Sequence, residues 1–216
     1  MRIVLLGQPG SGKGTQAQRL AAAQGIPRLT TGEMLRVAVR DGAPLGKDAK
    51  RYMERGDLVP DQLIVALMQE RMGTADCARG YILDGFPRTR VQAEALDAML
   101  TTVGAALQHV LLLEVDEAEI RRRLSGRREC PKCGSTFHLT AQPPKVAGVC
   151  DRCQTALVQR PDDQEATIAR RLAVYVRETK PLIGYYEARG LLRRVTAPGG
   201  PDEVFRAISS LITMGP

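Results

Sequence analysis

The sequence predicts an α/β protein whose parallel sheet is covered by helices on both faces. Two observations lead to this prediction. Short apolar runs alternate along the chain with longer segments of helical periodicity, which is typical of parallel sheets. The first apolar run, Ile3–Leu6, leads directly into the glycine-rich stretch Gly7–Thr15, GQPGSGKGT, and a helix-compatible segment follows. A strand, a glycine-rich turn and a helix in that order are typical of a phosphate-binding unit.

Length and composition limit the class of protein. The chain has 216 residues, 44% of them hydrophobic, which suits one α/β domain with insertions, or one domain plus a small one, and argues against disorder. No apolar run approaches the ~20 residues that a membrane-spanning helix needs. The phosphate loop begins at Gly7, which leaves no room for a cleaved leader before it. We therefore expect a cytoplasmic protein without a membrane partner.

The net charge of +7 makes nucleic acid a candidate partner. Aromatic residues make up only 4% of the chain and Trp is absent, so few side chains could stack on single-stranded bases. Arginines gathered around nucleotide phosphates would explain the charge equally well. We expect no nucleic-acid partner.

The elements of the first third of the chain surround the glycine-rich stretch. Residues 2–6 read as a buried strand because they are almost uninterruptedly apolar, and residues 13–24 read as a helix that stops near Gly25. Thr30 and Glu33 have capping-box spacing, so a helix should begin there. A short helix at 47–55 follows a break at 42–46. Residues 30–59 therefore look like a helical insertion between two core elements.

The rest of the chain continues the alternation, and Asp84 ends the next apolar run. Asp116 is expected to cap a helix, and Pro181 to end the regular part of a long one. Strands are predicted at residues 81–84, 110–115 and 191–195, and helices at residues 59–72, 89–100, 116–124, 162–187 and 202–212.

The glycines of the phosphate loop would let backbone N–H groups approach a phosphate, and the ammonium of Lys13 would add a point charge for the outer phosphates. Residues 7–13 fit G-x-x-x-x-G-K, but the next residue is Gly14, so the hydroxyl falls one place late, at Thr15. This departure argues against a direct contact between that hydroxyl and magnesium. The alternative is a glycine-rich turn that binds no ligand.

Asp84 ends a strand downstream of the loop, where a carboxylate can organise magnesium directly or through water. Its alternative role is that of a helix cap or a turn residue. Arginines near strand ends and insertion edges could neutralise phosphates, although arginines are, one by one, more often solvated surface residues. A nucleotide phosphate needs no general base because it is mostly dianionic at pH 7. The arginines are Arg36, Arg88, Arg123, Arg127, Arg160 and Arg171.

Four of the five cysteines form two C-x2-C pairs separated by sixteen residues: Cys130, Cys133, Cys150 and Cys153. Four thiolates saturate Zn²⁺ and leave no open position, so the pattern predicts a structural zinc site. The alternative is reduced or disulfide-bonded cysteine. Cys77 stands alone and is expected to be inert.

With these motifs the chain closely resembles the adenylate kinases of the long bacterial type, which carry a zinc-containing lid. The segments that carry the resemblance are GQPGSGKGTQ, TTGEMLR, GDLVPD, LDGFPRT with Gln92, RLSGRR, the four cysteines, and DDQEATIARRL followed by PLIGYY. The resemblance implies a P-loop nucleoside monophosphate kinase fold with a five-stranded parallel sheet. It divides the chain into a core (residues 1–29, 60–125 and 164–216), an NMP-binding insertion (30–59) and a lid (126–163).

The resemblance also implies the site residues. For ATP they are Gly10, Ser11, Gly12, Lys13, Gly14, Thr15, Arg123, Arg127, Thr136, Phe137 and Gly200. For AMP they are Thr31, Arg36, Asp57, Leu58, Val59, Gly85, Phe86, Pro87, Arg88 and Gln92. Arg160 and Arg171 would bridge towards the transferring phosphate, so the catalytic set is Lys13, Asp84, Arg88, Arg127, Arg160 and Arg171. Glu33 stands where many relatives have Asp, and Pro161 is a second small departure.

The implied activity is reversible phosphoryl transfer from ATP to AMP, giving two ADP, with Mg²⁺ and structural zinc, by a monomer. A nucleotide kinase that uses GTP or a pyrimidine acceptor is the nearest alternative. A zinc-ribbon ATPase that binds nucleic acid would need an extended basic surface. A catalytically silent interaction domain would not need Lys13, Asp84 and Arg88 together.

Overall fold

A computed structural model describes residues 1–196 and 200–213, and its centre is a five-stranded parallel sheet in the order β2-β3-β1-β4-β7. The predicted α/β class with a five-stranded sheet is confirmed. The parts of the predicted core at 197–199 and 214–216 lie outside the described residues. The strands are β1 (Arg2–Leu6), β2 (Arg28–Thr30), β3 (Tyr81–Asp84), β4 (His109–Leu113) and β7 (Leu192–Val195).

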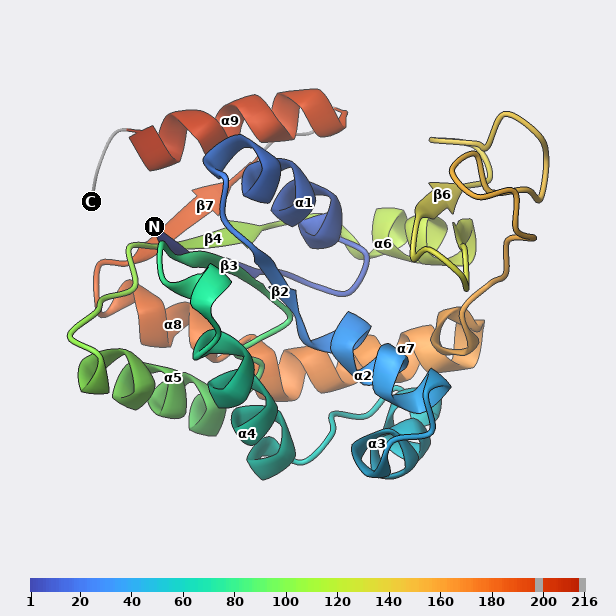
Figure 1. Cartoon of the computed structure of the whole chain (residues 1–216). Helices are drawn as coiled ribbons and strands as arrows, with labels where there is room; N and C mark the ends of the chain where they lie inside the picture. Colours follow the sequence, from blue (N-terminus) through green and yellow to red (C-terminus); the bar gives the residue numbers. More distant parts are fainter. Residues whose placement is uncertain (197–199, 214–216) are drawn as a thin grey trace.

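Helices cover both faces of the sheet, because alternate residues of each strand point to opposite sides. Ile3 and Leu5 of β1 pack with α1 and α9, whereas Val4 and Leu6 pack with α4, α5 and α8. Figure 1 shows α1 and α9 on one side of the sheet and α5 and α8 on the other. The bounds are α1 (Lys13–Gln24), α4 (Asp61–Met72), α5 (Arg90–Thr102), α8 (Leu182–Glu187) and α9 (Pro201–Thr213).

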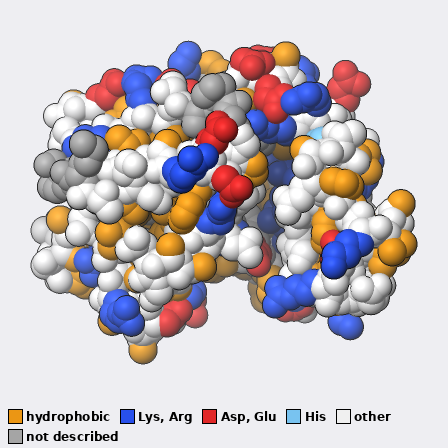
Figure 2. All heavy atoms as spheres, turned by 90° about the horizontal axis from the view of Figure 1, so that it is seen from above, with side chains coloured by type: hydrophobic (Ala, Val, Ile, Leu, Met, Phe, Trp, Pro, Cys, Tyr) orange, Lys and Arg blue, Asp and Glu red, His pale blue; other side chains and the backbone are white. Residues whose placement is uncertain are grey.

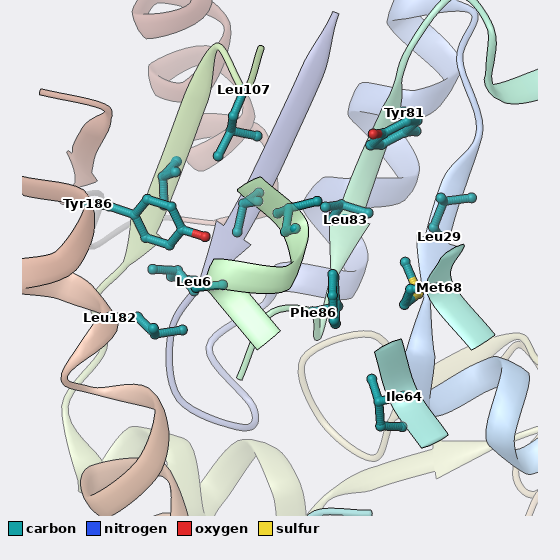
Figure 3. Close-up of a cluster of buried hydrophobic side chains, with 14 of the residues drawn as sticks. Leu6, Leu29, Ile64, Met68, Tyr81, Leu83, Phe86, Leu107, Leu182 and Tyr186 are labelled. Atoms are coloured by element: carbon teal, nitrogen blue, oxygen red, sulfur yellow. The ribbon is translucent and has the colours of Figure 1, made fainter. Parts of the chain in front are cut away.

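The larger buried cluster holds α4, α5 and α8 against one face of the sheet. Leu6 lies beside Tyr186 and Leu182 of α8, whereas Leu83 and Phe86 lie towards Met68 and Ile64 of α4 (Figure 3). Tyr186 and Phe86 are fully buried. Burying the side chain of Phe86 stabilises the fold by about 1.5–3 kcal/mol.

Strand register sets the relative position of the loops that follow the strands. Leu5 of β1 pairs with Asp84 of β3, and Leu6 pairs with Leu112 of β4. Parallel strands end at the same edge, so the phosphate loop after β1 lies beside Asp84 and the turn after it.

Two segments extend beyond this sheet. Residues 30–59 contain α2 (Thr31–Arg40) and α3 (Pro44–Arg55), and residues 126–163 contain the antiparallel pair β5 (Arg127–Glu129) and β6 (Thr136–His138). We call them the 30–59 segment and the cysteine segment. Between β4 and the cysteine segment lies α6 (Glu117–Ser125), whose first turn is capped by Asp116 as predicted. No helix in the described part of the chain is long and apolar enough to cross a bilayer.

The structure departs from the predicted elements in several places, of which three are close to the cavity or the sheet edge. Strand β2 was not predicted, because it has only three residues. Thr30 precedes α2 but its side chain makes no capping hydrogen bond, and Glu33 pairs with Arg28 instead. The predicted helix 162–187 is divided into a 3-10 turn (Pro161–Asp163), α7 (Glu165–Val174), a π-helical turn (Tyr175–Thr179) and α8.

Candidate active site

A cavity with a volume of about 1520 Å³ runs from the phosphate loop to both segments outside the sheet. Figure 2 shows it as a groove between two lobes, with Lys and Arg side chains in its depth. A typical pocket for one small ligand has roughly 300–1,000 Å³, so this cavity has room for two nucleotides. Its walls include residues from the phosphate loop, the 30–59 segment, the turn after β3 and the cysteine segment.

The phosphate loop has the geometry that its glycines permit. Gly12 directly precedes α1 with φ 97°, a conformation that other residues rarely adopt. A Cβ on Gly7 would lie 2.6 Å from the carbonyl oxygen of Leu113, so only glycine fits against β4 there. The N-terminal end of α1 consequently points its free N–H groups into the cavity, where an anion is favoured.

Lys13 lies at the floor of the cavity, and its ammonium donates to the carbonyl oxygens of Gly7 and Gln8, at 2.7 Å each. Burial lowers the pKa of Lys13 to about 7, nearby Asp84 opposes this shift, and Arg88 adds to it. A bound phosphate would supply the negative charge that the buried ammonium lacks.

Asp84 is buried beside the start of α1. A Cβ placed on Gly14 would lie 3.4 Å from its Oδ2 atom, and within residues 1–196 and 200–213 its carboxylate accepts no hydrogen bond. The carboxylate therefore keeps its lone pairs for a water molecule or a cation, so it fits the predicted role in holding magnesium.

The basic side chains of the cavity are held by buried carboxylates. Arg127 makes a bidentate pair with Asp163 (Nε–Oδ2 2.7 Å and Nη2–Oδ1 2.5 Å), and Arg171 Nη1 lies 2.9 Å from the Oδ1 atom of Asp163. Asp163 is fully buried and thus compensates two guanidinium groups at once. Arg160 pairs with Glu129. Burial, together with Arg127 and Arg36, lowers the pKa of Arg160 to about 9, which indicates that the cluster still lacks negative charge.

On the side of the 30–59 segment, polar groups are fixed by hydrogen bonds to the turn after β3. The Thr31 hydroxyl donates to the carbonyl oxygen of Gly85 (2.8 Å). The side-chain oxygen of Gln92 accepts from the backbone N–H of Arg88, and its nitrogen donates to Asp61, both at 2.8 Å. Thr179, in the π-helical turn, donates to the Arg88 carbonyl (2.8 Å). The turn is therefore held in place from three directions.

Arg123 lies at the opposite end of the cavity and faces the phosphate loop. Its Nε donates to Glu119, one turn earlier in α6, at 2.6 Å, and its Nη1 would lie 3.9 Å from a Cβ on Gly12. Arg121 pairs with Glu117, whereas Arg122 and Arg123 both pair with Glu119 and line the cavity. Thr136, Phe137 and Gly200 also line this end.

The four cysteines form one cluster. All four Sγ atoms lie within 4.8 Å of one another, with Cys130–Cys153 at 3.3 Å and Cys133–Cys150 at 3.5 Å. In each pair the backbone folds back, with Gly134 N donating to Cys130 O and Gln154 N to Cys150 O, both at 2.9 Å. Four converging thiols fit a tetrahedral zinc ion with no open position. The site lies on two tight turns in the cysteine segment.

Most of the predicted site residues line this cavity. The side chain of Phe86 does not: it is completely buried in the hydrophobic core, between residues of β3 and α4 (Figure 3). In this stretch Gly85, Pro87 and Arg88 reach the cavity. Phe86 contributes packing that supports the turn, because an aromatic side chain of its size is most stable when removed from water.

Three carboxylates of the site were missed at the level of sequence: Asp162, Asp163 and Glu129. Asp162 and Glu129 line the cavity, and Asp163 lies directly behind it. The signal that could have found them is charge balance. The partly buried arginines of the cavity need carboxylates nearby to balance their charge. The adjacent pair Asp162-Asp163 is a candidate, because it follows Arg160 after a single residue.

The arrangement can position two phosphorylated ligands end to end. One end offers a phosphate loop with a lysine, the other offers Arg36 and Arg88, and Arg127, Arg160 and Arg171 also line the cavity. Phosphoryl transfer requires positioning and charge neutralisation more than covalent help. The fold and cavity are those of a P-loop phosphotransferase.

Comparison with known proteins identifies the family. A family model described as "Adenylate kinase" matches residues 5–191. The chain is 50% identical to the adenylate kinase of Syntrophobacter fumaroxidans, over 98% of this chain and 100% of that protein. It is 49% identical to that of Thermodesulfovibrio yellowstonii (98% and 99%) and 51% identical to that of Acidothermus cellulolyticus (98% of each). The chain belongs to the adenylate kinase family.

Proposed function

We propose that this chain catalyses the reversible transfer of the terminal phosphoryl group of ATP to AMP, giving two ADP. Its family membership supports this reaction. The observation that carries the site assignment is the continuous cavity, which joins the phosphate loop to the turn Gly85–Arg88 and the 30–59 segment. Donor and acceptor phosphates can therefore meet at the arginines in the middle.

In the proposed site ATP binds at the phosphate loop. The N-terminal end of α1 and Lys13 hold the phosphates, and Lys13 follows the charge onto the transferring group. Asp84 holds magnesium, which would neutralise phosphate oxygens when bound. Arg123 lies against the adenine, while Arg127, Thr136, Phe137 and Gly200 close over the nucleotide.

AMP binds at the other end. Arg36 and Arg88 bind its phosphate, and Thr31, Gln92 and residues 57–59 surround the nucleoside. Both Gln92 and Thr31 are already held by protein groups, so the pocket is organised before the acceptor enters. Pre-organised polar groups discriminate against bases that would leave them unpaired.

We further propose that the domain boundaries are those inferred from the sequence: a core (1–29, 60–125, 164–216), an insertion that closes over AMP (30–59) and a lid that closes over ATP (126–163). Closure brings Arg160 and Arg171 to the transferring phosphate and excludes water, which would otherwise accept the phosphoryl group. Zinc at the four cysteines folds the lid and takes no part in the reaction, because a four-thiolate site has no open position. We expect a cytoplasmic monomer.

A panel of nucleotides tests the assignment. ATP and GTP are each combined with AMP, GMP, CMP and UMP, and product formation is followed by chromatography. We expect ATP with AMP to have the highest kcat/KM. A comparable kcat/KM for CMP or UMP would move the assignment to a pyrimidine nucleotide kinase, and preference for GTP would change the donor. Salt-dependent DNA binding with stimulated ATP hydrolysis would favour the zinc-ribbon ATPase.

A further inference from the structure

Glu129 is a charged residue of the cavity to which neither the motifs nor the proposed reaction gives a role. It is the last residue of β5, and its backbone is fixed on both sides: N donates to Val158 O (2.8 Å) and O accepts from Val158 N (2.9 Å). It also pairs with Thr136 of β6. The next residue, Cys130, belongs to the cysteine cluster. The side chain is therefore aimed into the cavity from a rigid part of the cysteine segment.

The carboxylate of Glu129 lies between two arginines from different parts of the chain. Its Oε2 atom accepts from the guanidinium of Arg160, and its Oε1 atom lies 3.7 Å from Nε of Arg36, on α2. Its side chain is only 14% exposed. A carboxylate this far removed from water is stable because both cations compensate its charge.

These two arginines are the ones that the proposed reaction assigns to phosphates: Arg36 to the acceptor phosphate and Arg160 to the group being transferred. Burial is the main cause that lowers the pKa of Arg36 and of Arg160, so each guanidinium needs an anion. Glu129 supplies one such anion within the protein through its two contacts, in addition to Asp162 and Asp163. A phosphate that reaches the same guanidinium groups must displace the carboxylate or share them with it.

We propose that Glu129 is an affinity-determining residue for the acceptor nucleotide: its carboxylate occupies Arg36 and Arg160 in the substrate-free cavity and competes with the acceptor phosphate for them. The inference rests on the proposed function, since it assumes that the acceptor phosphate binds at Arg36. The competition weakens acceptor binding and links the 30–59 segment to the cysteine segment while the site is empty. The donor is held mainly at Lys13 and Arg123, away from Glu129, so the effect on donor binding is smaller.

The test compares the intact chain with Glu129→Gln, which keeps the size of the side chain and removes its charge. A matched control is Glu117→Gln, which removes the same charge from an exposed pair with Arg121 outside the cavity. For each protein three quantities are measured: KM for AMP at saturating ATP, KM for ATP at saturating AMP, and the inhibition constant of inorganic phosphate against AMP.

We expect Glu129→Gln to lower KM for AMP and the inhibition constant of phosphate by about fivefold, with less than about a twofold change in KM for ATP. The control should change none of these. Unchanged or raised values for AMP and phosphate would overturn the inference, because Glu129 would then only orient the arginines. If the intact chain does not phosphorylate AMP at all, the proposed function fails instead.

Zinc content and thermal midpoint show whether Glu129→Gln is folded. If it is not, a second variant tests the inference. Glu129→Asp keeps the charge but draws the carboxylate back from Arg36 by one methylene group. KM for AMP and the phosphate inhibition constant should then fall in the same direction by a smaller factor, about twofold. If both constants rise, the competition does not exist.

Discussion

The ammonium of Lys13 donates a 2.7 Å hydrogen bond to the carbonyl oxygen of Gly7, so the lysine is folded back onto its own loop. A bound nucleotide would offer a stronger, charged acceptor and draw the ammonium towards its phosphates. Lys13 therefore has two alternative sets of partners, and three of its properties can be tested: turnover, protonation and stability.

Lys13→Met should lower turnover by about 10³-fold or more, because the lysine follows the charge that develops on the transferring group. The fold should be retained, since the side chain is replaced by one of similar length without charge. The control Lys47→Met removes an exposed charge from α3 and should have normal turnover. Steady-state rates with ATP and AMP measure turnover, and circular dichroism checks that the fold is retained. Near-normal turnover in Lys13→Met would remove the argument from the phosphate loop.

Binding of ATP at pH 8 should take up protons. Burial lowers the pKa of Lys13 to about 7 in the empty protein, so most of the lysine is neutral at pH 8. Bound phosphates raise that pKa again, and the uptake should approach about one proton per nucleotide. Calorimetry in two buffers of different ionisation enthalpy measures it. Lys13→Met should show no such uptake. Equal uptake by both proteins would mean that a group other than Lys13 binds the proton.

The same lowered pKa has a consequence for stability. Between pH 7 and the ordinary value of 10.5, the unfolded chain holds the Lys13 proton and the folded chain does not. Unfolding therefore binds a proton in this range, and the free energy of unfolding rises with pH. The destabilising contribution is fully present below pH 7 and is lost towards pH 10. Urea unfolding at several pH values should show a steeper rise for the intact chain than for Lys13→Met, and parallel curves would contradict this account.

Asp163→Asn should destabilise the protein by about 3–5 kcal/mol, because Arg127 and Arg171 would lose the buried carboxylate that compensates them. Urea unfolding measures the loss, and saturating ATP should restore part of it by supplying negative charge. The matched control is Asp48→Asn on the exposed face of α3, for which no change is expected. A loss below about 1 kcal/mol would mean that Asp163 is no more than a surface partner.

Replacing Cys130 and Cys133 together by Ser should release the metal and lower the thermal midpoint, because zinc binding supplies folding free energy to the cysteine segment. At low temperature substantial activity should remain, since Lys13, Arg88 and Arg160 are unchanged. Cys77→Ser, away from the cluster, should keep its zinc. Loss of turnover while hydrogen exchange shows the segment still folded would mean that the metal is more than structural. If no metal copurified with the intact chain and its thiols titrated freely, the four cysteines would not bind metal.

Strands and the phosphate loop were the most predictable parts of the molecule. β1 and β3 match the predicted residues, because a buried parallel strand has an uninterrupted apolar run. Strand β2 has no such run: its three residues, Arg28–Thr30, include one buried apolar side chain. It is a strand because β3 offers it an open edge, and no local pattern encodes that partner.

Site residues were predictable where a motif specifies backbone shape, as at Gly12 and Lys13. They were not predictable where a role depends on which charges meet in space. Asp163 lies 36 residues after Arg127, and only the folded chain brings the two together. Phe86 shows a different limit: its side chain lies in the core although the residue is inside a motif, because a motif position does not specify which side of the turn is buried.

The order of the strands also determines when the strand that precedes the phosphate loop gains its neighbours. β1 is made first during synthesis, yet its two neighbours are β3 and β4, and β4 ends only at Leu113. A nascent chain that has emerged only as far as α5 leaves one edge of β1 without hydrogen-bonding partners, and an open apolar edge invites pairing with other chains. Of the five strands, β1 waits longest for its neighbours. β1 is thus the strand that needs protection for longest, until β4 has been translated.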